Sequence, residues 1–285
     1  MNVINAITDI SSIFPDNHFS MEKWELYIDK QLPGAKEKCT ADMKGCINSG
    51  ASFENDFLPV LDYVCENPKI CDVAVNSFLA VTDSLDEKII NVFNKTVDAD
   101  VILYIGLCNG AGWATEINGR TTVLLGVEKI LELGWYSVDD MTGLIVHELG
   151  HIYHNQYGFS VPKTDTSKER YIWQLFREGV AMVFEQEIIG KDNYFHQDKN
   201  GWKNWCDKNV MQIKQSFNKD IENMTPNNQC YFGDWVKFHG YGDTGYYLGA
   251  LFVRYLLRFD SFDNIIRYSL DEVKEKYRMF AVAAE

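Results

Sequence analysis

Two histidines and a glutamate lie within five residues of one another in the stretch "MTGLIVHELGHIYHNQYG", residues 141–158. In a helix, residues i and i+4 share one face, so His147 and His151 can both direct a ring nitrogen at one metal ion. Glu148 lies ~100° around the helix from His147, given 3.6 residues per turn. From there its carboxylate can take a proton from a water molecule. This H-E-x-x-H spacing predicts a zinc ion, one per chain, held by two imidazoles and served by Glu148 as general base.

A catalytic zinc ion usually has three protein ligands and one open position. The metzincin continuation H-E-x-x-H-x-x-G-x-x-H is absent, because His154 and Tyr157 occupy its glycine and last histidine positions. His154 does lie on the same face as His147, seven residues further on. A single straight helix is poorly shaped to wrap three ligands around an ion, so we expect His154 to be a neighbour of the site or a polar helix end.

The segment "TSKERYIWQLFREGVAMVFEQEIIG", residues 166–190, is a better source of the third ligand. Thr166 and Glu169 have the capping-box spacing at its start, and Gly190 marks its end, so it is predicted to be one helix. One stripe of this helix carries Tyr171, Gln174, Glu178, Ala181 and Glu185.

Glu178 is the predicted third ligand, which would complete a His₂Glu site. Two carboxylates and an alanine are unusual on a stripe that faces a core. The small residues Gly179 and Ala181 would let this helix press against the zinc helix. The alternative is a surface glutamate in a salt bridge with Lys168 or Arg177.

These segments resemble a known family. "REGVAMVFE" (177–185) resembles the N-E-G-F-A helix of the aminopeptidase N family of gluzincin zinc metallopeptidases, which share a thermolysin-like catalytic domain. In that family the glutamate of this helix is the third zinc ligand. "GYYLGALFVRYLL" (245–257) resembles the Y-x-K-G-A segment, with Tyr246, Gly249 and Ala250 matching and Leu248 replacing the lysine.

The order of the three motifs is preserved, and the resemblance covers roughly residues 100–260. Together with "GWATEINGRTTVLLG" (112–126), the pattern also looks like a family of uncharacterised bacterial predicted zinc-dependent proteases. The resemblance implies a zincin-like fold and metallopeptidase chemistry. The G-x-M-E-N motif that grips a free amine in aminopeptidases is missing, and Glu116 lies on a comparable strand without matching neighbours. Aminopeptidase activity is therefore not implied.

The oxyanion of a peptide-hydrolysis intermediate needs a neutral donor in addition to zinc, and a tyrosine suits this role. The Y-x-x-G-A match favours Tyr246. Tyr247, Tyr241 and His239 lie in the same dense segment, "FHGYGDTGYY", and stay open as alternatives. Packing is the other possible role of any one of these tyrosines.

The pattern of elements predicts an α+β fold, mostly helical with a small antiparallel sheet. Residues 1–97 are expected to form an N-terminal helical region packed on a metallopeptidase domain, residues 98–285. The run "VILYIGL" (101–107) is typical of a buried strand, and Asn118-Gly119 indicates a hairpin. The strand Gly112–Ile117 before that turn could pair with an extended peptide substrate.

The composition narrows the function classes. A formal net charge of −14 over 285 residues disfavours nucleic acid as a partner. The start of the chain lacks the pattern of a signal peptide, and no run approaches the ~20 apolar residues of a membrane helix. Seven scattered cysteines fit reduced thiols, so we expect a cytoplasmic protein. With the charge, the hydropathy and the metal motif taken together, the expected partner is a peptide or protein substrate, and neither a membrane nor nucleic acid is expected.

Two other functions fit the same residues. One is a zinc-binding scaffold without turnover, although a scaffold has no need of Glu148. The other is a zinc hydrolase of non-peptide amides or esters. The sequence leaves open the substrate, exo- or endopeptidase cleavage, and the oligomeric state.

Overall fold

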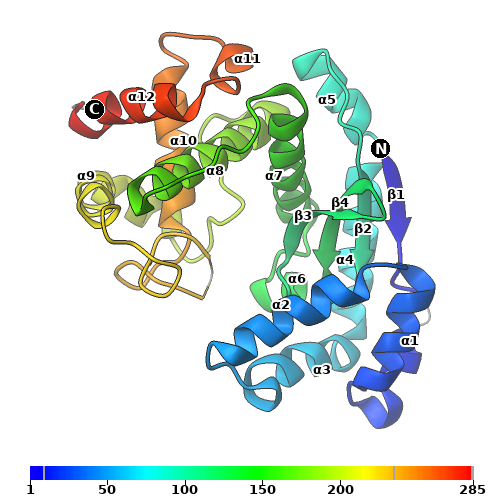
Figure 1. The fold of residues 1–285 in the computed structure, drawn as a ribbon. Coiled ribbons are helices and arrows are strands. Elements are labelled where there is room, and N and C mark those ends of the chain that lie inside the picture. The colour runs from blue at the N-terminus through cyan, green and yellow to red at the C-terminus, as the bar shows by residue number, and fades with distance from the viewer. Residues whose placement is uncertain (9, 234, 284–285) are drawn as a thin grey trace. The chain divides into compact units, whose positions relative to one another are not determined.

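The structure is a computed structural model and describes residues 1–8, 10–233 and 235–283. The chain forms two compact units, Met1–Leu149 and Gly150–Glu285. Their division falls inside one uninterrupted helix, α7 (Val138–Tyr157), which is drawn in green in Figure 1. The predicted assignment of the catalytic domain to residues 98–285 stays a prediction.

The first unit contains a four-stranded mixed sheet with the strand order β1-β2-β4-β3. Its strands are β1 (Asn2–Asn5), β2 (Asp100–Tyr104), β3 (Gly112–Ile117) and β4 (Arg120–Gly126). Only β3 and β4 are antiparallel, whereas β2 runs parallel to both β1 and β4. The prediction of an antiparallel sheet was therefore wrong. A hairpin determines the direction of its own two strands only, and β2 lies beside β4 rather than beside β3.

The predicted hairpin is confirmed. Asn118 and Gly119 have φ values of 50° and 78° and join Ile117 to its partner Arg120. Two consecutive positive φ values match the twist of the flanking strands and favour the Asn-Gly pair. Because β2 pairs with β4, β3 lies at one edge of the sheet, the position that the predicted pairing of Gly112–Ile117 with a peptide requires.

In the first unit, helices α1 to α5 lie between β1 and β2 along the chain, and α6 follows β4 (Figure 1). The α-helices are α1 (Met21–Gln31), α2 (Lys36–Asn48), α3 (Leu58–Glu66), α4 (Pro68–Thr82), α5 (Leu85–Phe93) and α6 (Val127–Leu133), and the short helical turns are η1 (Ile10–Ile13), η2 (Pro15–Asn17) and η3 (Phe53–Phe57). The hydroxyl of Ser20 accepts a hydrogen bond from the Lys23 amide and so caps the start of α1. The helical prediction for residues 1–97 missed β1, because only pairing with β2 makes this short segment a strand.

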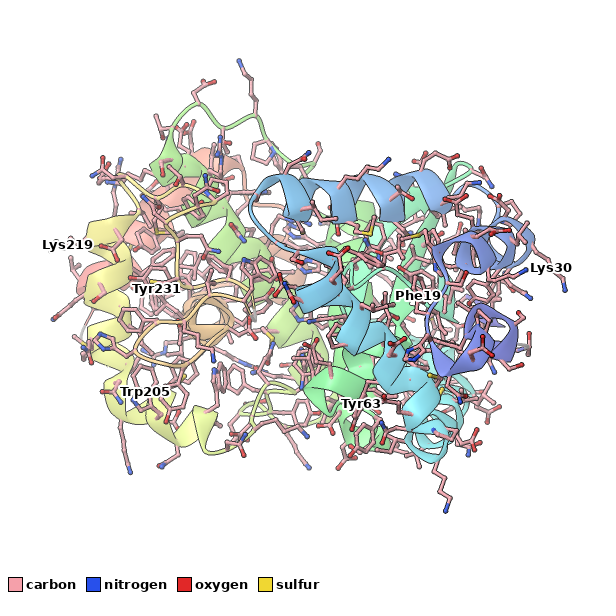
Figure 2. The ribbon with its side chains drawn as sticks, turned by 90° about the horizontal axis from the view of Figure 1, so that it is seen from below. Phe19, Lys30, Tyr63, Trp205, Lys219 and Tyr231 are labelled. Carbon is pink, nitrogen blue, oxygen red and sulfur yellow. The ribbon has the colours of Figure 1, made fainter. Side chains whose placement is uncertain are left out.

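The second unit is helical and begins with the last turns of α7. Its further helices are α8 (Ser167–Ile189), α9 (Trp202–Asp220), α10 (Thr244–Leu256), α11 (Phe262–Ile265) and α12 (Leu270–Val282). Helices α8 and α10 cross at two glycines, where a Cβ on Gly179 would lie 2.1 Å from the carbonyl oxygen of Gly249. Aromatic side chains fill the interior, and buried Tyr231 lies within the unit whereas Lys219 on α9 points outward (Figure 2).

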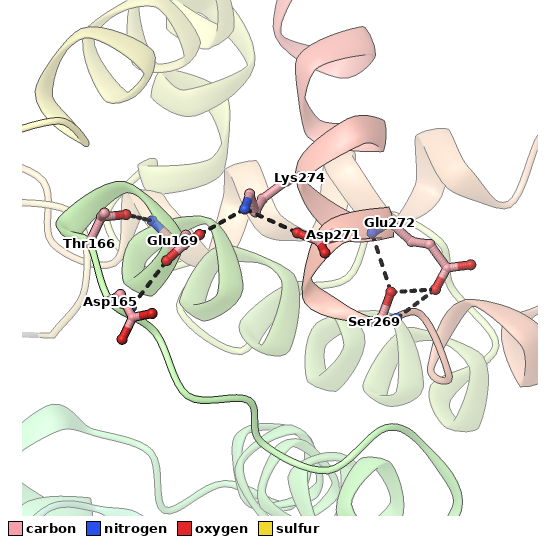
Figure 3. A network of polar contacts seen from close by, with 7 residues as sticks. All are labelled: Asp165, Thr166, Glu169, Ser269, Asp271, Glu272 and Lys274. Atoms are coloured by element: carbon pink, nitrogen blue, oxygen red, sulfur yellow. Dashed lines mark hydrogen bonds and ion pairs between the residues drawn. The ribbon is translucent and has the colours of Figure 1, made fainter.

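The start of α8 is held by a polar network (Figure 3). The Thr166 hydroxyl accepts a hydrogen bond from the Glu169 amide, as the capping pattern predicted. The Glu169 carboxylate accepts from the Asp165 amide rather than from Thr166, and it also accepts from the Lys274 ammonium at 2.7 Å. Lys274 belongs to α12, so the network ties the first turn of α8 to that helix. The left-handed Gly190 ends α8, again as predicted.

Two further findings concern the whole described chain. All seven cysteines, at 39, 46, 65, 71, 108, 206 and 230, are free thiols. Within the described residues, every helix is either too short or too polar to cross a lipid bilayer.

Candidate metal centre

The H-E-x-x-H residues lie in the middle of α7, as the sequence predicted. The helix begins beside Ser137, whose hydroxyl accepts a hydrogen bond from the Asp140 amide. The acidic residues in its first turn interact favourably with the positive end of the helix dipole and so stabilise the helix. His147, Glu148 and His151 are 3%, 8% and 9% exposed. Burial of three polar side chains is costly without partners, which argues against two solvated surface histidines.

The third predicted ligand lies close to the second. The Nε2 atom of His151 is 3.1 Å from the Oε2 atom of Glu178 on α8, and both side chains are largely buried. Two atoms at zinc–nitrogen and zinc–oxygen distances of about 2.0–2.1 Å lie about 3.3 Å apart at the tetrahedral angle. The same spacing suits a direct hydrogen bond when no ion is bound. Lys168, one of the alternative partners of Glu178, pairs instead with Glu222.

Small residues bring α7 and α8 together inside the second unit. A Cβ built on Gly150 would lie 2.9 Å from the Cα atom and 3.2 Å from the carbonyl oxygen of Ala181. The predicted role of Ala181 is therefore confirmed. Gly179 was expected to serve the same contact, but it lies against Gly249 of α10 instead. Residues 179 and 181 are ~200° apart on a helix, so they cannot face the same neighbour.

Among the described residues, His147, His151 and Glu178 form a group that could hold a metal ion. One ligand atom from each lies within 4.8 Å of the others. Two imidazole nitrogens and one carboxylate oxygen are a donor set that suits zinc and leaves a fourth position open. The residues present therefore fit the predicted ion, although other divalent metals accept the same donors.

A second group of this kind consists of His147, Glu185 and His196. His196 Nδ1 lies 3.1 Å from both carboxylate oxygens of Glu185, and both residues are almost completely buried. Glu185 is on the stripe that the sequence singled out, seven residues after Glu178. The contribution of His196 was missed because it lies beyond the end of α8, and no local pattern connects it with the zinc helix. A carboxylate behind a metal-binding histidine commonly fixes its orientation.

Glu148 lies against the edge strand of the first unit. A Cβ on Gly112, the first residue of β3, would lie 2.9 Å from Cγ and 3.3 Å from Oε1 of Glu148. The carboxylate predicted to act as general base is therefore next to the start of β3, the edge strand of the sheet as described. A side chain larger than that of glycine at this position would require Glu148 or Leu144 to shift.

Comparisons of this chain with protein-family models, curated protein sequences and solved structures found no match. The gluzincin resemblance therefore rests on the residues quoted from the sequence alone. The arrangement of His147, His151 and Glu178 is independent of that resemblance.

The alternative candidates for the oxyanion donor differ in the contacts that their side chains make. The Tyr247 hydroxyl donates to Asp207 Oδ1 at 2.9 Å, and its ring is buried beside Phe195. Tyr241 stacks on Trp205 with ring centroids 4.4 Å apart. His239 is exposed at a left-handed backbone position. Tyr247 and Tyr241 therefore take part in hydrogen bonding and packing of their own, and the choice among the candidates stays a prediction.

Tyr246 is half-buried and lies one turn before Gly249 on α10. Gly249 touches Gly179, the residue directly after Glu178, so Tyr246 lies close to the crossing of α10 and the helix that carries the third ligand. Its ring also meets Phe232 edge to face. Its role as the donor stays a prediction.

Of the two roles expected for His154, a neighbour of the site or a polar helix end, the second is wrong. Its side chain is 1% exposed and packs against Trp173 and Phe176 of α8. Burial, together with the nearby Arg177 guanidinium and His151, lowers the pKa of His154 to about 3. The residue is thus a neutral core histidine near neutral pH, and it belongs to neither metal-binding group.

Proposed function

We propose that this chain is a zinc-dependent metallopeptidase of the gluzincin type with a zincin-like fold. The observation that carries the proposal is the close approach of His151 and Glu178, 3.1 Å apart, next to His147. His147, His151 and Glu178 would hold the zinc ion. A zinc ion there supplies Lewis acidity, which makes water a nucleophile near neutral pH and polarises a carbonyl group.

In the proposed reaction, Glu148 transfers protons and Tyr246 stabilises the developing negative charge. Glu148 takes a proton from the attacking water as its oxygen bonds to the carbonyl carbon. The Tyr246 hydroxyl donates a hydrogen bond to the carbonyl oxygen as negative charge develops on it. The carbon–nitrogen bond then breaks, and Glu148 passes its proton to the leaving amine. These steps need Glu148 in its ionised and protonated states in turn and Tyr246 as a neutral phenol.

The edge strand β3 offers a place for the substrate. An extended peptide could add to the free edge of β3 by main-chain hydrogen bonds, with the bond to be cleaved near Gly112 and Glu148. Edge strands with free N–H and C=O groups bind peptide backbones with little regard to side chains. This favours a peptide or protein substrate over a small non-peptide amide.

The decisive experiment compares zinc-loaded wild type with the Glu148→Gln variant. Each protein is incubated with a diverse peptide mixture, cleavage is read by mass spectrometry, and zinc content is measured separately. We expect cleavage by wild type only and equal zinc in both proteins, because the substituted amide keeps the side-chain shape but cannot accept the proton. The new termini would distinguish exopeptidase from endopeptidase cleavage.

Other results would reject the proposal in distinct ways. Zinc bound to both proteins with no cleavage by either would favour a scaffold or a non-peptide hydrolase. Equal cleavage by both proteins would show that Glu148 is not the general base. A wild type that binds no zinc would remove the basis of the proposal.

A further inference from the structure

A completely buried glutamate lies outside the metal centre, in the first unit. Glu128 is the second residue of α6, directly after β4, and its side chain is 0% exposed. One carboxylate oxygen, Oε2, accepts a hydrogen bond from the Gly106 amide at 3.0 Å, and the other, Oε1, accepts from the Cys108 amide at 3.1 Å. Both donors belong to residues 105–111, which we call the 105–111 loop. This loop joins β2 to the edge strand β3.

The carboxylate is surrounded by backbone. A Cβ on Gly106 would lie 2.7 Å from Glu128 Oε1, and a Cβ on Gly126 would lie 3.0 Å from the same oxygen. The Gly126 amide also donates to the carbonyl oxygen of Ala111 at 3.1 Å. The two glycines therefore let the loop close around Glu128, and the end of the loop is tied to the end of β4.

The loop has a conformation that needs such support. Cys108 has φ of 56°, a left-handed value that costs a non-glycine residue about 1 kcal/mol or more, and Gly110 has φ of 140°. A second anchor comes from Asn109, whose amide group donates to the Cys39 carbonyl and to the Asp42 carboxylate on α2, each at 2.9 Å. The loop is therefore held from α6 on one side and from α2 on the other.

The loop leads directly to Gly112, which lies against Glu148. A shift of the loop would move the start of β3 away from that carboxylate. Catalysis is sensitive to such shifts, since a misplacement of ~1 Å can cost ~10²-fold in rate.

We propose that Glu128 is a positioning residue, whose carboxylate holds the 105–111 loop so that Gly112 and the edge strand stay in register with Glu148. The clamp itself is a property of the first unit, and its effect on turnover rests on the proposed peptidase function. The geometry assigns to Glu128 no contact with substrate or metal.

The charge state of Glu128 offers an independent test. Burial raises the pKa of its carboxyl to about 7, against the opposing effect of its backbone hydrogen bonds and of Lys129. The other titratable groups near it are Tyr27, Cys39, Tyr104 and Cys108, and burial raises the pKa of each. They stay protonated between pH 6 and 8, so Glu128 is the group that ionises in this range. Protonation removes one of the two acceptor oxygens and loosens the loop.

The experiment measures amide hydrogen exchange at Gly106, Cys108 and Gly112 in wild type and in Glu128→Gln. The variant keeps the side-chain shape but turns an NH₂ group towards one of the two amide donors. We expect exchange at these amides to accelerate at least ~10-fold, the ratio that the loss of one hydrogen bond to a charged group produces. The exposed Glu132 on the same helix provides the control, and Glu132→Gln should leave exchange unchanged.

Two further measurements make the test specific. In wild type, protection of the Cys108 amide, corrected for intrinsic exchange, should rise between pH 6 and pH 8, and this rise should vanish in Glu128→Gln. With peptide substrate, kcat should fall at least ~10-fold in Glu128→Gln at unchanged zinc content, as expected when the edge strand is misplaced relative to the general base. Asn109→Ala removes the second anchor, so it should likewise accelerate amide exchange in the loop and lower kcat.

Unchanged exchange at Gly106 and Cys108 in Glu128→Gln would overturn the clamp. Faster exchange with unaltered kcat and KM would overturn its positioning role. If Glu128→Gln fails to fold, the pH dependence of wild-type exchange and the Asn109→Ala variant still decide the matter. Exchange at Gly112 is read without substrate, so a failed clamp is distinguished from a chain that does not cleave peptides.

Discussion

Gly150 of α7 and Ala181 of α8 meet backbone to backbone, since a Cβ on Gly150 would lie 2.9 Å from the Cα atom of Ala181. His151 follows Gly150 directly, and Glu178 lies one turn before Ala181. The spacing between these two predicted ligands therefore depends on how closely the helices approach.

We expect Gly150→Ala to lower the free energy of unfolding by ~1–3 kcal/mol, because the added methyl group forces packed backbone apart. Zinc affinity should fall as well, since His151 and Glu178 separate. Gly45 in the exposed middle of α2 is the matched control, with nothing within 4 Å of an added Cβ. Gly45→Ala should stabilise by ~0.5–1 kcal/mol. Chemical denaturation and competition with a zinc chelator measure both effects, and a more stable Gly150→Ala variant would contradict the close approach.

Glu178→Ala should lose stoichiometric zinc, because two imidazoles alone hold the ion weakly. Metal content after dialysis gives the answer. Glu187→Ala is the control on the same helix, since Glu187 pairs with Arg254 at 2.7 Å rather than with a histidine. Full retention of zinc in Glu178→Ala would move the third ligand elsewhere, with Glu185 as the next residue to change.

Tyr246→Phe should lower kcat by ~10²–10³, the usual loss when one oxyanion donor is removed. Zinc content and stability should stay at the wild-type level. Tyr247→Phe is the neighbouring control, because it removes the hydrogen bond to Asp207 and should cost ~1 kcal/mol of stability while leaving kcat unchanged. If Tyr246→Phe turns over as fast as wild type, Tyr246 is a packing residue.

His154 should make the fold sensitive to acid. Its pKa in the folded protein, about 3, is lower than in the unfolded chain, so the unfolded chain binds the proton first as pH falls. The stability that the neutral ring contributes above pH ~6.5 is therefore lost progressively towards pH 3, by up to ~3 kcal/mol between pH 6.5 and pH 4 at 1.36 kcal/mol per unit.

Denaturation of metal-free protein at several pH values tests this expectation. His154→Leu should flatten the acid limb of the stability curve, whereas a change at exposed His239 should leave it steep. An identical slope in wild type and His154→Leu would show that other groups control the acid sensitivity.

The sequence by itself determined the features that depend on residues close together in the chain. The spacing of His147 and His151 places both on one face of α7, and the caps Thr166 and Gly190 bound α8. The Asn118-Gly119 turn defines the hairpin of β3 and β4. Helix periodicity, capping and turn geometry are local, so a single sequence is sufficient to predict them.

Only the tertiary structure decided which elements meet. The parallel pairing of β2 with β4, the contact of Gly179 with Gly249 and the pairing of Glu185 with His196 join segments that no local pattern connects. Each depends on the burial of apolar surface and the satisfaction of buried polar groups across the whole unit. The same competition buried His154 among aromatic rings and enclosed Glu128 in backbone, although neither environment follows from the residues on either side.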